Sequence, residues 1–327
     1  MRHKHDVIGL RLDTDKDYRK KVIFIASAAY SGSTMLDMML SNRPDGFSVG
    51  EVVALFRPHR PHHFGAECGC GSPSCRIWKN VLKEGEHNVY QTLFGSFPDL
   101  RFIVDSSKHP FWIEKQSKNA LRQGFDVVHV LLWKEPGAFA HSMLKRQQPH
   151  WRKHWIRYYH QYASILAKLG SRISFHSLSY ETLARNPEAC LEKLCGGVGI
   201  SKKLNQAEFW NKQHHALFGN DSAKVHLTNR TEVGRGIRQG EITKRDSNHR
   251  SIYFDSDVQN KLPVNIAREI KSDKDIARIR LALMGLDNDP LRLSEIAWPE
   301  FRVLLSRAVY LARRLAGRGL GRWLWVY

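Results

Sequence analysis

Residues 22–40 constrain the fold more than any other stretch of the chain. An apolar, β-prone run at 22–26 leads into a loop of small residues, Ser31-Gly32-Ser33-Thr34, and the loop leads into a helical pattern with apolar positions from 35 to 40. A strand, a tight turn and the first turn of a helix direct several backbone N–H groups at one point, and the helix adds about half a positive charge there. The stretch therefore predicts a P-loop-like strand-loop-helix that binds a phosphate or a sulfate.

The loop lacks the Gly-Lys-Ser/Thr of a Walker A sequence. That absence disfavours a kinase-type P-loop enzyme, as does the lack of a clear carboxylate for Mg²⁺. The loop also has an ordinary structural interpretation, in which Ser31 or Ser33 is the N-cap of a helix. Other segments of the chain are needed to decide between an anion site and a simple cap.

Composition and charge narrow the class of protein. The chain has 327 residues, of which 42% are hydrophobic and 25% charged, as in ordinary globular proteins, but its formal net charge is +19. A protein this basic attracts polyanions such as nucleic acid, anionic lipid, or an acidic cofactor or glycan. Because no basic-aromatic RNA-binding motif accompanies the charge, we expect no nucleic-acid partner.

The sequence also indicates a compartment. Residues 1–20 form a charged, polar lead-in without the apolar stretch of a signal peptide, and no apolar run reaches the length of about 18 residues that predicts a membrane-spanning helix. The five cysteines are an odd number, which argues against a disulfide framework. We therefore expect a cytoplasmic protein.

Apolar runs predict five strands, over residues 22–27, 47–53, 102–105, 127–133 and 173–178. Helical patterns alternate with them, over residues 77–95, 112–123, 138–145, 151–169, 180–194 and 264–284. This alternation predicts a three-layer α/β fold with a central parallel sheet covered on both faces. We divide the chain into the lead-in at 1–20, an α/β domain at 21–298 with a basic loop at 219–250, and a basic amphipathic C-terminal helix at 299–327.

Polar segments follow several of the predicted strands. They are the loop at 31–34 and the segments 105–108, 134–142 and 179–188. Because ligands of doubly wound folds bind beyond the carboxyl ends of the strands, we expect all four segments to face one crevice. Lys134 and the Ser142 hydroxyl can meet on a second phosphate there, whereas Asp105 is interpreted as a turn or capping residue.

In order and spacing these segments resemble the sulfotransferases that use 3′-phosphoadenosine 5′-phosphosulfate (PAPS), over about residues 20–225. The resemblance implies that the loop Tyr30-Ser31-Gly32-Ser33-Thr34 holds the 5′-phosphosulfate, and that Lys134 and Ser142 hold the 3′-phosphate. Two further stretches are similar to family motifs. They are Tyr180-Glu181-x-Leu183 before Pro187, and His215 with Gly219-Asn220.

The resemblance also implies a reaction. Glu51, after Gly50, matches the catalytic base of protein-tyrosine and some bacterial members, and the segment at Ser107-Lys108 resembles the one that carries their catalytic lysine. The implied activity is transfer of a sulfuryl group from PAPS to a hydroxyl of a glycan, glycolipid or related acceptor. Glu51 would act as general base and Lys108 would stabilise the leaving nucleotide.

The chain departs from the family pattern at three positions. Tyr30 stands where the family usually has Arg or Lys, Lys134 replaces an Arg, and Ala223 with Lys224 stands at the Arg of the Gly-Asn-x-x-Arg pattern. Lysine binds phosphate as a point charge and lacks the bidentate fork of arginine. A second interpretation therefore stays open, a catalytically weak or inactive protein that binds a nucleotide or polyanion on the same fold. Basic residues of the loop at 224–250 are candidates to compensate.

Cys68, Cys70 and Cys75 form a cysteine-rich segment with His62 and His63 nearby. A similar Cys-x-Cys-Gly…Cys…Trp segment, here ending in Trp78, is found in many bacterial sulfotransferase-like chains. We favour structural thiols over a zinc site or a redox-labile pair, because the Cys-x-Cys spacing is not that of zinc ribbons. The sequence thus leads us to assign no metal site.

Two helical segments leave alternatives open. The helix at 299–327 can pack on the domain, attach peripherally to an anionic membrane on the inner face, or contact a partner. The aromatic segment at 148–160 can stack on a sugar ring, or it can be a core helix whose cations reach past its apolar face to solvent.

Overall fold

The computed structural model describes residues 19–58, 61–65, 68–72, 75–220, 223, 252, 254–286 and 289–315. Most of the predicted lead-in at 1–20, nearly all of the basic loop at 219–250 and the end of the C-terminal helix at 316–327 lie outside these residues. The compensating role expected of residues 224–250 therefore stays a prediction.

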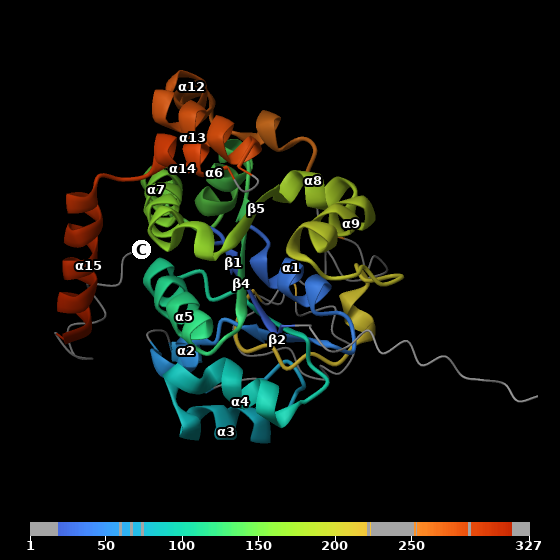
Figure 1. Cartoon of the computed structure of the whole chain (residues 1–327). Coiled ribbons are helices and arrows are strands. Elements are labelled where there is room, and N and C mark those ends of the chain that lie inside the picture. Colours follow the sequence, from blue (N-terminus) through green and yellow to red (C-terminus); the bar gives the residue numbers. More distant parts are fainter. Residues whose placement is uncertain are drawn as a thin grey trace, which may run out of the picture.

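A five-stranded, all-parallel sheet forms the centre of the molecule, in the order β2-β3-β1-β4-β5 (Figure 1). Its strands are β1 (Lys21–Ala26), β2 (Gly46–Gly50), β3 (Phe102–Asp105), β4 (Asp126–Trp133) and β5 (Ser174–Ser179). All five predicted strands are confirmed. The predicted end of β2 was wrong, because the strand stops at Gly50, whose φ of +64° turns the chain.

Helices cover both faces of the sheet, as predicted. Side chains of one face, such as Ile23 and Ile25, pack against α1 (Ser33–Leu40), α8 (Tyr180–Arg185) and α9 (Pro187–Val198). Side chains of the other face, such as Val22 and Phe24, share a core with α4 (Val89–Ser96), α5 (Pro110–Arg122), α6 (Pro136–Leu144), α7 (Trp151–Leu169), α13 (Lys274–Met284) and α14 (Pro290–Ile296). Burial on both sides explains why the strand sequences are continuously apolar.

Three predicted helices are divided in the structure. The helix at 77–95 is α3 (Arg76–Glu84), a 3₁₀ turn η2 (Glu86–Asn88) and α4, with Gly85 at φ +86° between them. The helix at 264–284 is α12 (Val264–Ser272) and α13, because the Asp273 side chain accepts hydrogen bonds from the first-turn amides of α13. Asn186 in the same way caps α9 after α8. Capping side chains therefore mark two of these breaks, and a glycine with positive φ marks the third.

The structure also contains short elements that the sequence pattern did not predict. They are α2 (Val53–Phe56), η1 (Pro61–Phe64), η3 (Gly170–Arg172), η4 (Phe209–Asn211) and η5 (Val258–Lys261). The aromatic segment at 148–160 opens α7, where Trp151, Trp155 and Tyr159 are buried in the core. These three rings therefore pack in the core, and none of them is exposed for stacking on a sugar ring.

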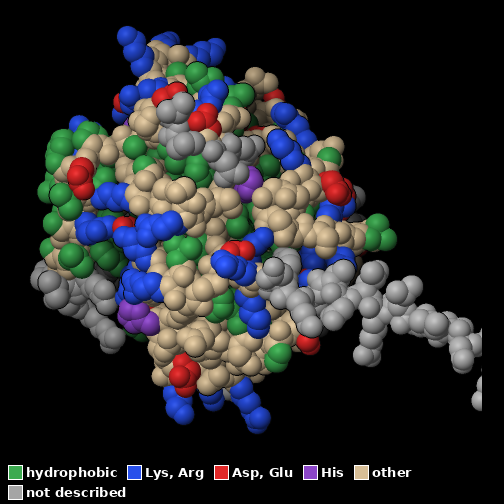
Figure 2. Space-filling view, viewed as in Figure 1, with side chains coloured by type: hydrophobic (Ala, Val, Ile, Leu, Met, Phe, Trp, Pro, Cys, Tyr) green, Lys and Arg blue, Asp and Glu red, His purple; other side chains and the backbone are tan. Residues whose placement is uncertain are grey.

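The C-terminal helix α15 (Glu300–Leu315) packs on the domain along one side only (Figure 1). Val303 is buried, and the buried Ser306 hydroxyl accepts a hydrogen bond from Gln161 at 3.1 Å. On the outer side Phe301 and Leu305 are 66% and 62% exposed, and Figure 2 shows hydrophobic side chains gathered along this helix at the left of the view. Packing on the domain is thus observed, while contact with an anionic membrane stays a prediction. None of the described helices combines the length and the apolarity needed to cross a bilayer.

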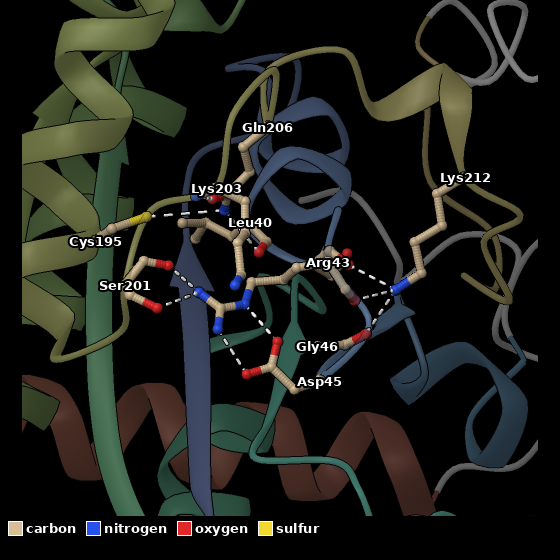
Figure 3. A network of polar contacts seen from close by, with 10 residues as sticks. Leu40, Arg43, Asp45, Gly46, Cys195, Ser201, Lys203, Gln206 and Lys212 are labelled. Atoms are coloured by element: carbon tan, nitrogen blue, oxygen red, sulfur yellow. Dashed lines mark hydrogen bonds and ion pairs between the residues drawn. The ribbon is translucent and has the colours of Figure 1, made fainter. Parts of the chain in front are cut away.

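A polar network attaches the chain after α9 to the turn between α1 and β2 (Figure 3). The Arg43 guanidinium donates to both carboxylate oxygens of Asp45, at 2.5 and 2.6 Å, and to the Ser201 carbonyl. The Lys212 ammonium donates to three backbone carbonyls, of Ser41, Arg43 and Gly46, at 2.8, 2.6 and 2.8 Å. Burial lowers the pKa of Lys212 to about 8.

We expect Lys212→Met to lower the free energy of unfolding by about 1–3 kcal/mol, because three carbonyls lose a charged donor. The control Lys203→Met, at an exposed side chain, should change it by less than about 0.5 kcal/mol. The unfolded state binds more protons than the folded state between pH 8 and 10.5, so the contribution of Lys212 to stability rises with pH in that window. Urea unfolding at several pH values measures both effects, and equal losses in the two variants would contradict the assignment.

Candidate functional site

The predicted anion loop enters α1 without a side-chain cap. Gly32 is the N-cap residue, with φ +90° and ψ +11°, and no side chain accepts a hydrogen bond from the first-turn amides. The interpretation of Ser31 or Ser33 as an ordinary N-cap was therefore wrong. The first-turn amides of α1 have no side-chain acceptor, and a helix N-terminus of this kind can bind an external anion.

Tyr180 connects this loop to the second predicted phosphate segment. A Cβ on Gly32 would lie 2.5 Å from Cδ2 of Tyr180, so only glycine lets the loop backbone approach the ring this closely. On the same tyrosine, the Lys134 ammonium lies 4.9 Å from the ring centroid, and it donates to the Ser142 hydroxyl at 3.0 Å. The loop after β1, the segment after β4 and the start of α8 are thus neighbours.

The backbone around Lys134 is held from two sides. The Trp155 indole N–H donates to the Lys134 carbonyl at 3.0 Å, and the Glu135 amide donates to both carboxylate oxygens of Glu181 at 3.2 Å. Burial raises the pKa of Glu181, and the hydrogen bonds from backbone amides oppose that rise. Glu181 therefore positions the turn that carries Lys134. The sequence analysis named Glu181 only as part of a stretch that resembles a family motif.

The segment with Gly219 and Asn220 lies against the other side of the anion loop. The Asn220 amide donates to the Thr34 hydroxyl at 3.0 Å, and a Cβ on Gly219 would lie 2.8 Å from the same oxygen. The structure thus brings these two predicted residues to Thr34, at the first turn of α1.

Glu51 and Lys108 form an ion pair at the ends of β2 and β3, with 2.5 Å between Nζ and Oε1. Both side chains are about one-fifth exposed, at 21% and 20%. The Glu51 amide donates to the Leu217 carbonyl at 2.8 Å, and the Tyr158 hydroxyl donates to the Lys108 carbonyl at 2.8 Å. Lys108 has φ +60°, a left-handed conformation that is uncommon for lysine and that tertiary contacts must maintain.

Buried carboxylates fix the turn that carries Lys108. Asp105 accepts hydrogen bonds from the Tyr90 hydroxyl at 2.7 Å, the Trp112 indole at 3.0 Å and the Ser107 amide at 2.7 Å. These contacts agree with the prediction that Asp105 is a turn or capping residue. Asp37 of α1 accepts from the Ser106 hydroxyl at 2.6 Å, and burial raises its pKa to about 7.

Arg146 is a candidate site residue that the sequence analysis missed. Its guanidinium carbon lies 4.1 Å from the ring centroid of Tyr30, a cation–π contact, and its Nη1 donates to the Ser142 carbonyl at 2.9 Å. Tyr30 itself has φ +62°. Arg146 thus places a guanidinium on the ring of Tyr30, at the start of the predicted anion loop. No local pattern indicates it, because it lies far downstream and follows α6.

His215, which the resemblance grouped with Gly219 and Asn220, faces the cysteine segment. Cys68 Sγ and Cys75 Sγ are 3.5 and 3.6 Å from its Nδ1. The predicted cysteine segment therefore gathers around this histidine, next to the Glu51 backbone partner Leu217.

No family model matches the chain, and no curated protein matches its sequence. Among solved structures, a sulfotransferase domain from the curacin biosynthetic pathway is similar with a TM-score of 0.52 and 15% identity, over 82% of this chain and 99% of that one. A sulfotransferase domain from the Synechococcus PCC 7002 olefin synthase gives a TM-score of 0.49 and 15% identity, over 83% and 96%. The first similarity shows the fold.

We expect Gly32→Ala to destabilise the protein more than Gly124→Ala. Both positions have positive φ, +90° and +81°, so both variants lose about 1–2 kcal/mol to backbone strain. Only the Gly32 variant must also displace Tyr180, because no atom lies within 4 Å of a Cβ on Gly124. Denaturant unfolding of the two variants measures the difference, and equal losses would show that Tyr180 does not contact the loop.

Proposed function

Because the chain has a sulfotransferase-like fold, we propose that it transfers a sulfuryl group from PAPS to a hydroxyl of a glycan, glycolipid or related acceptor. The observation that carries the proposal is the continuous contact from Gly32 through Tyr180 to Lys134 and Ser142. These groups would offer two anion-binding positions beyond the carboxyl ends of β1 and β4. A nucleotide with phosphates at both its 5′ and 3′ positions requires two such positions.

The charges and hydrogen-bonding groups of these residues support this donor. The uncapped amides of α1, with the Ser33 and Thr34 hydroxyls, would hold the 5′-phosphosulfate, and Arg146 beside Tyr30 would add the charge that Tyr30 lacks. Lys134 and Ser142 would hold the 3′-phosphate, because their side chains already converge. Bound there, the donor supplies the sulfuryl group that leaves its 5′-phosphate.

Glu51 and Lys108 would act on the acceptor side and the leaving side of the transfer. The Glu51 carboxylate would take the proton of the acceptor hydroxyl, and the ion pair with Lys108 holds its oxygen in place before the acceptor binds. Lys108 would then stabilise the negative charge that develops on the leaving nucleotide. Sulfuryl transfer resembles phosphoryl transfer in that positioning and electrostatics supply most of the rate.

A second candidate function is binding of a nucleotide or polyanion without turnover. It is favoured by two substitutions relative to the family pattern, Tyr30 and Lys134. The two functions make the same binding prediction and differ only in whether Glu51 supports turnover.

We expect 3′-phosphoadenosine 5′-phosphate to raise the melting temperature of the protein, and ATP to raise it much less. At one hundred times its Kd, such a ligand stabilises the folded state by about 2.7 kcal/mol. Lys134→Ala should weaken binding about tenfold or more, because a charged hydrogen bond is lost, whereas Lys145→Ala, at an exposed lysine, should not. Differential scanning fluorimetry tests this, and no shift at millimolar nucleotide would refute the proposed donor.

We expect Glu51→Gln to lower the rate of sulfuryl transfer by about 10²–10⁴ while nucleotide affinity is retained, because the amide cannot take the proton. Glu84→Gln, at an exposed helix position, is the matched control. The assay follows labelled sulfate from PAPS into a panel of glycans and glycolipids. Full activity of the Glu51 variant would exclude it as the base, and binding without turnover in the wild type would favour the second candidate.

A further inference from the structure

Four potential metal ligands meet beside the candidate site. They are Cys68, Cys70, Cys75 and His215, and one ligand atom from each lies within 4.8 Å of all the others. Three come from the segment that follows α2 and one comes from the segment that follows η4, so only the folded chain brings them together. All three cysteines are free thiols in the structure.

Two of the distances among these atoms match tetrahedral coordination. With Zn–S bonds of about 2.3 Å and a Zn–N bond of about 2.0–2.1 Å, a tetrahedral site places sulfur and nitrogen about 3.6 Å apart. Nδ1 of His215 lies 3.5 Å from Cys68 Sγ and 3.6 Å from Cys75 Sγ. The histidine nitrogen therefore faces two sulfurs at the distance that a shared metal ion would impose.

The surroundings hold the ligands in this arrangement. The Trp78 indole N–H lies 3.4 Å from Cys68 Sγ and donates to the His215 carbonyl at 3.0 Å. Phe47 stacks on the His215 ring, with centroids 5.9 Å apart and planes parallel within 1°. N–H groups aimed at thiolate sulfur and ring contacts that fix an imidazole are the outer contacts expected of a metal site.

Backbone contacts join the two ligand-bearing segments directly. The Gly69 amide donates to the Ala216 carbonyl at 2.9 Å, and the Gly71 amide donates to the Cys68 carbonyl at 2.9 Å. A Cβ on Gly69 would lie 2.9 Å from the His214 carbonyl oxygen, so glycine permits this approach. The turn between Cys68 and Cys70 is thereby closed against the His215 segment.

We propose that Cys68, Cys70, Cys75 and His215 bind one Zn²⁺ ion in a closed, structural site. Three thiolates and one imidazole fill all four positions of a tetrahedral zinc ion and leave none for a substrate. The site would fasten two segments that local structure does not hold, since the described part of each has few regular elements. This proposal replaces the preference for structural thiols, which rested on sequence spacing alone.

An ion at this position would also affect residues of the candidate functional site. Leu217, two residues after His215, donates its amide to Val49 at 3.1 Å and accepts from the Glu51 amide at 2.8 Å. Further along, Asn220 donates to Thr34. A metal ion on His215 would therefore stabilise the segment that contacts both Glu51 and the anion loop.

The first test measures metal in the full-length, untagged protein purified without chelator. We expect about one zinc per chain by mass spectrometry of metals, and a marked loss of zinc in Cys75→Ser and in His215→Ala. Cys190→Ser is the matched control, because Cys190 lies outside the cluster, and it should keep the zinc. Wild-type protein without stoichiometric zinc that also fails to bind added Zn²⁺ would overturn the proposal.

The second test uses Co²⁺ as a spectroscopic probe in the wild type, so it does not depend on whether a variant folds. Co²⁺ exchanged into the site should give the strong visible absorption of a tetrahedral ion and the ultraviolet bands of thiolate ligands. Zn²⁺ should abolish both, and a chelator should lower the melting temperature by several degrees. Absence of these bands, or a disulfide between two of the three cysteines in the purified protein, would refute the site.

Discussion

The contact of Tyr180 with Gly32 and Lys134 is the interaction on which the arrangement of the site depends. It is possible because β1 lies beside β4 and β4 beside β5, so the loops that leave these three strands at their carboxyl ends are adjacent. On the other side of β1, Lys108 and Glu51 follow the strands β3 and β2. The sheet order thus places the loop after β1 between the turn that carries Lys134 and the Glu51–Lys108 ion pair.

Buried polar groups hold these loops more than regular structure does. The turn after β3 is fixed by three hydrogen bonds to Asp105, and the turn after β4 by the indole of Trp155 and the carboxylate of Glu181. Burying a carboxylate is unfavourable unless donors surround it, which is why these donors come from several elements at once. The Tyr158 hydroxyl donates to the carbonyl of Lys108 and so contributes to its left-handed conformation. A cation in such a conformation is oriented before any ligand arrives.

The sequence predicted the strands and the strand-loop-helix because their signals are local. An apolar run of five or six residues bounded by small or polar residues can be recognised as a strand without knowledge of its tertiary contacts. The breaks at Asp273 and Asn186 are also local, and capping residues could have located them. Other features depend on pairs far apart in the chain. Arg146 contacts Tyr30 and His215 contacts Cys68 across long separations in the sequence, and no periodicity reports such contacts. The lack of a side-chain cap at Gly32 is likewise a property of the folded loop.

The segment from Lys212 to Asn220 shows how a region with little regular structure can still be fixed. Contacts at four places along the segment fix it, two through side chains and two through backbone groups that no helix or strand pairs. Lys212 binds the turn before β2, His215 faces the cysteines, Leu217 pairs with Val49 and Glu51, and Asn220 binds Thr34. Because β2 is an edge strand, this pairing also occupies backbone groups at the carboxyl end of that edge. The position of Glu51 therefore depends on a part of the chain far downstream, and a metal ion at His215 would add a bond between that part and the cysteine segment.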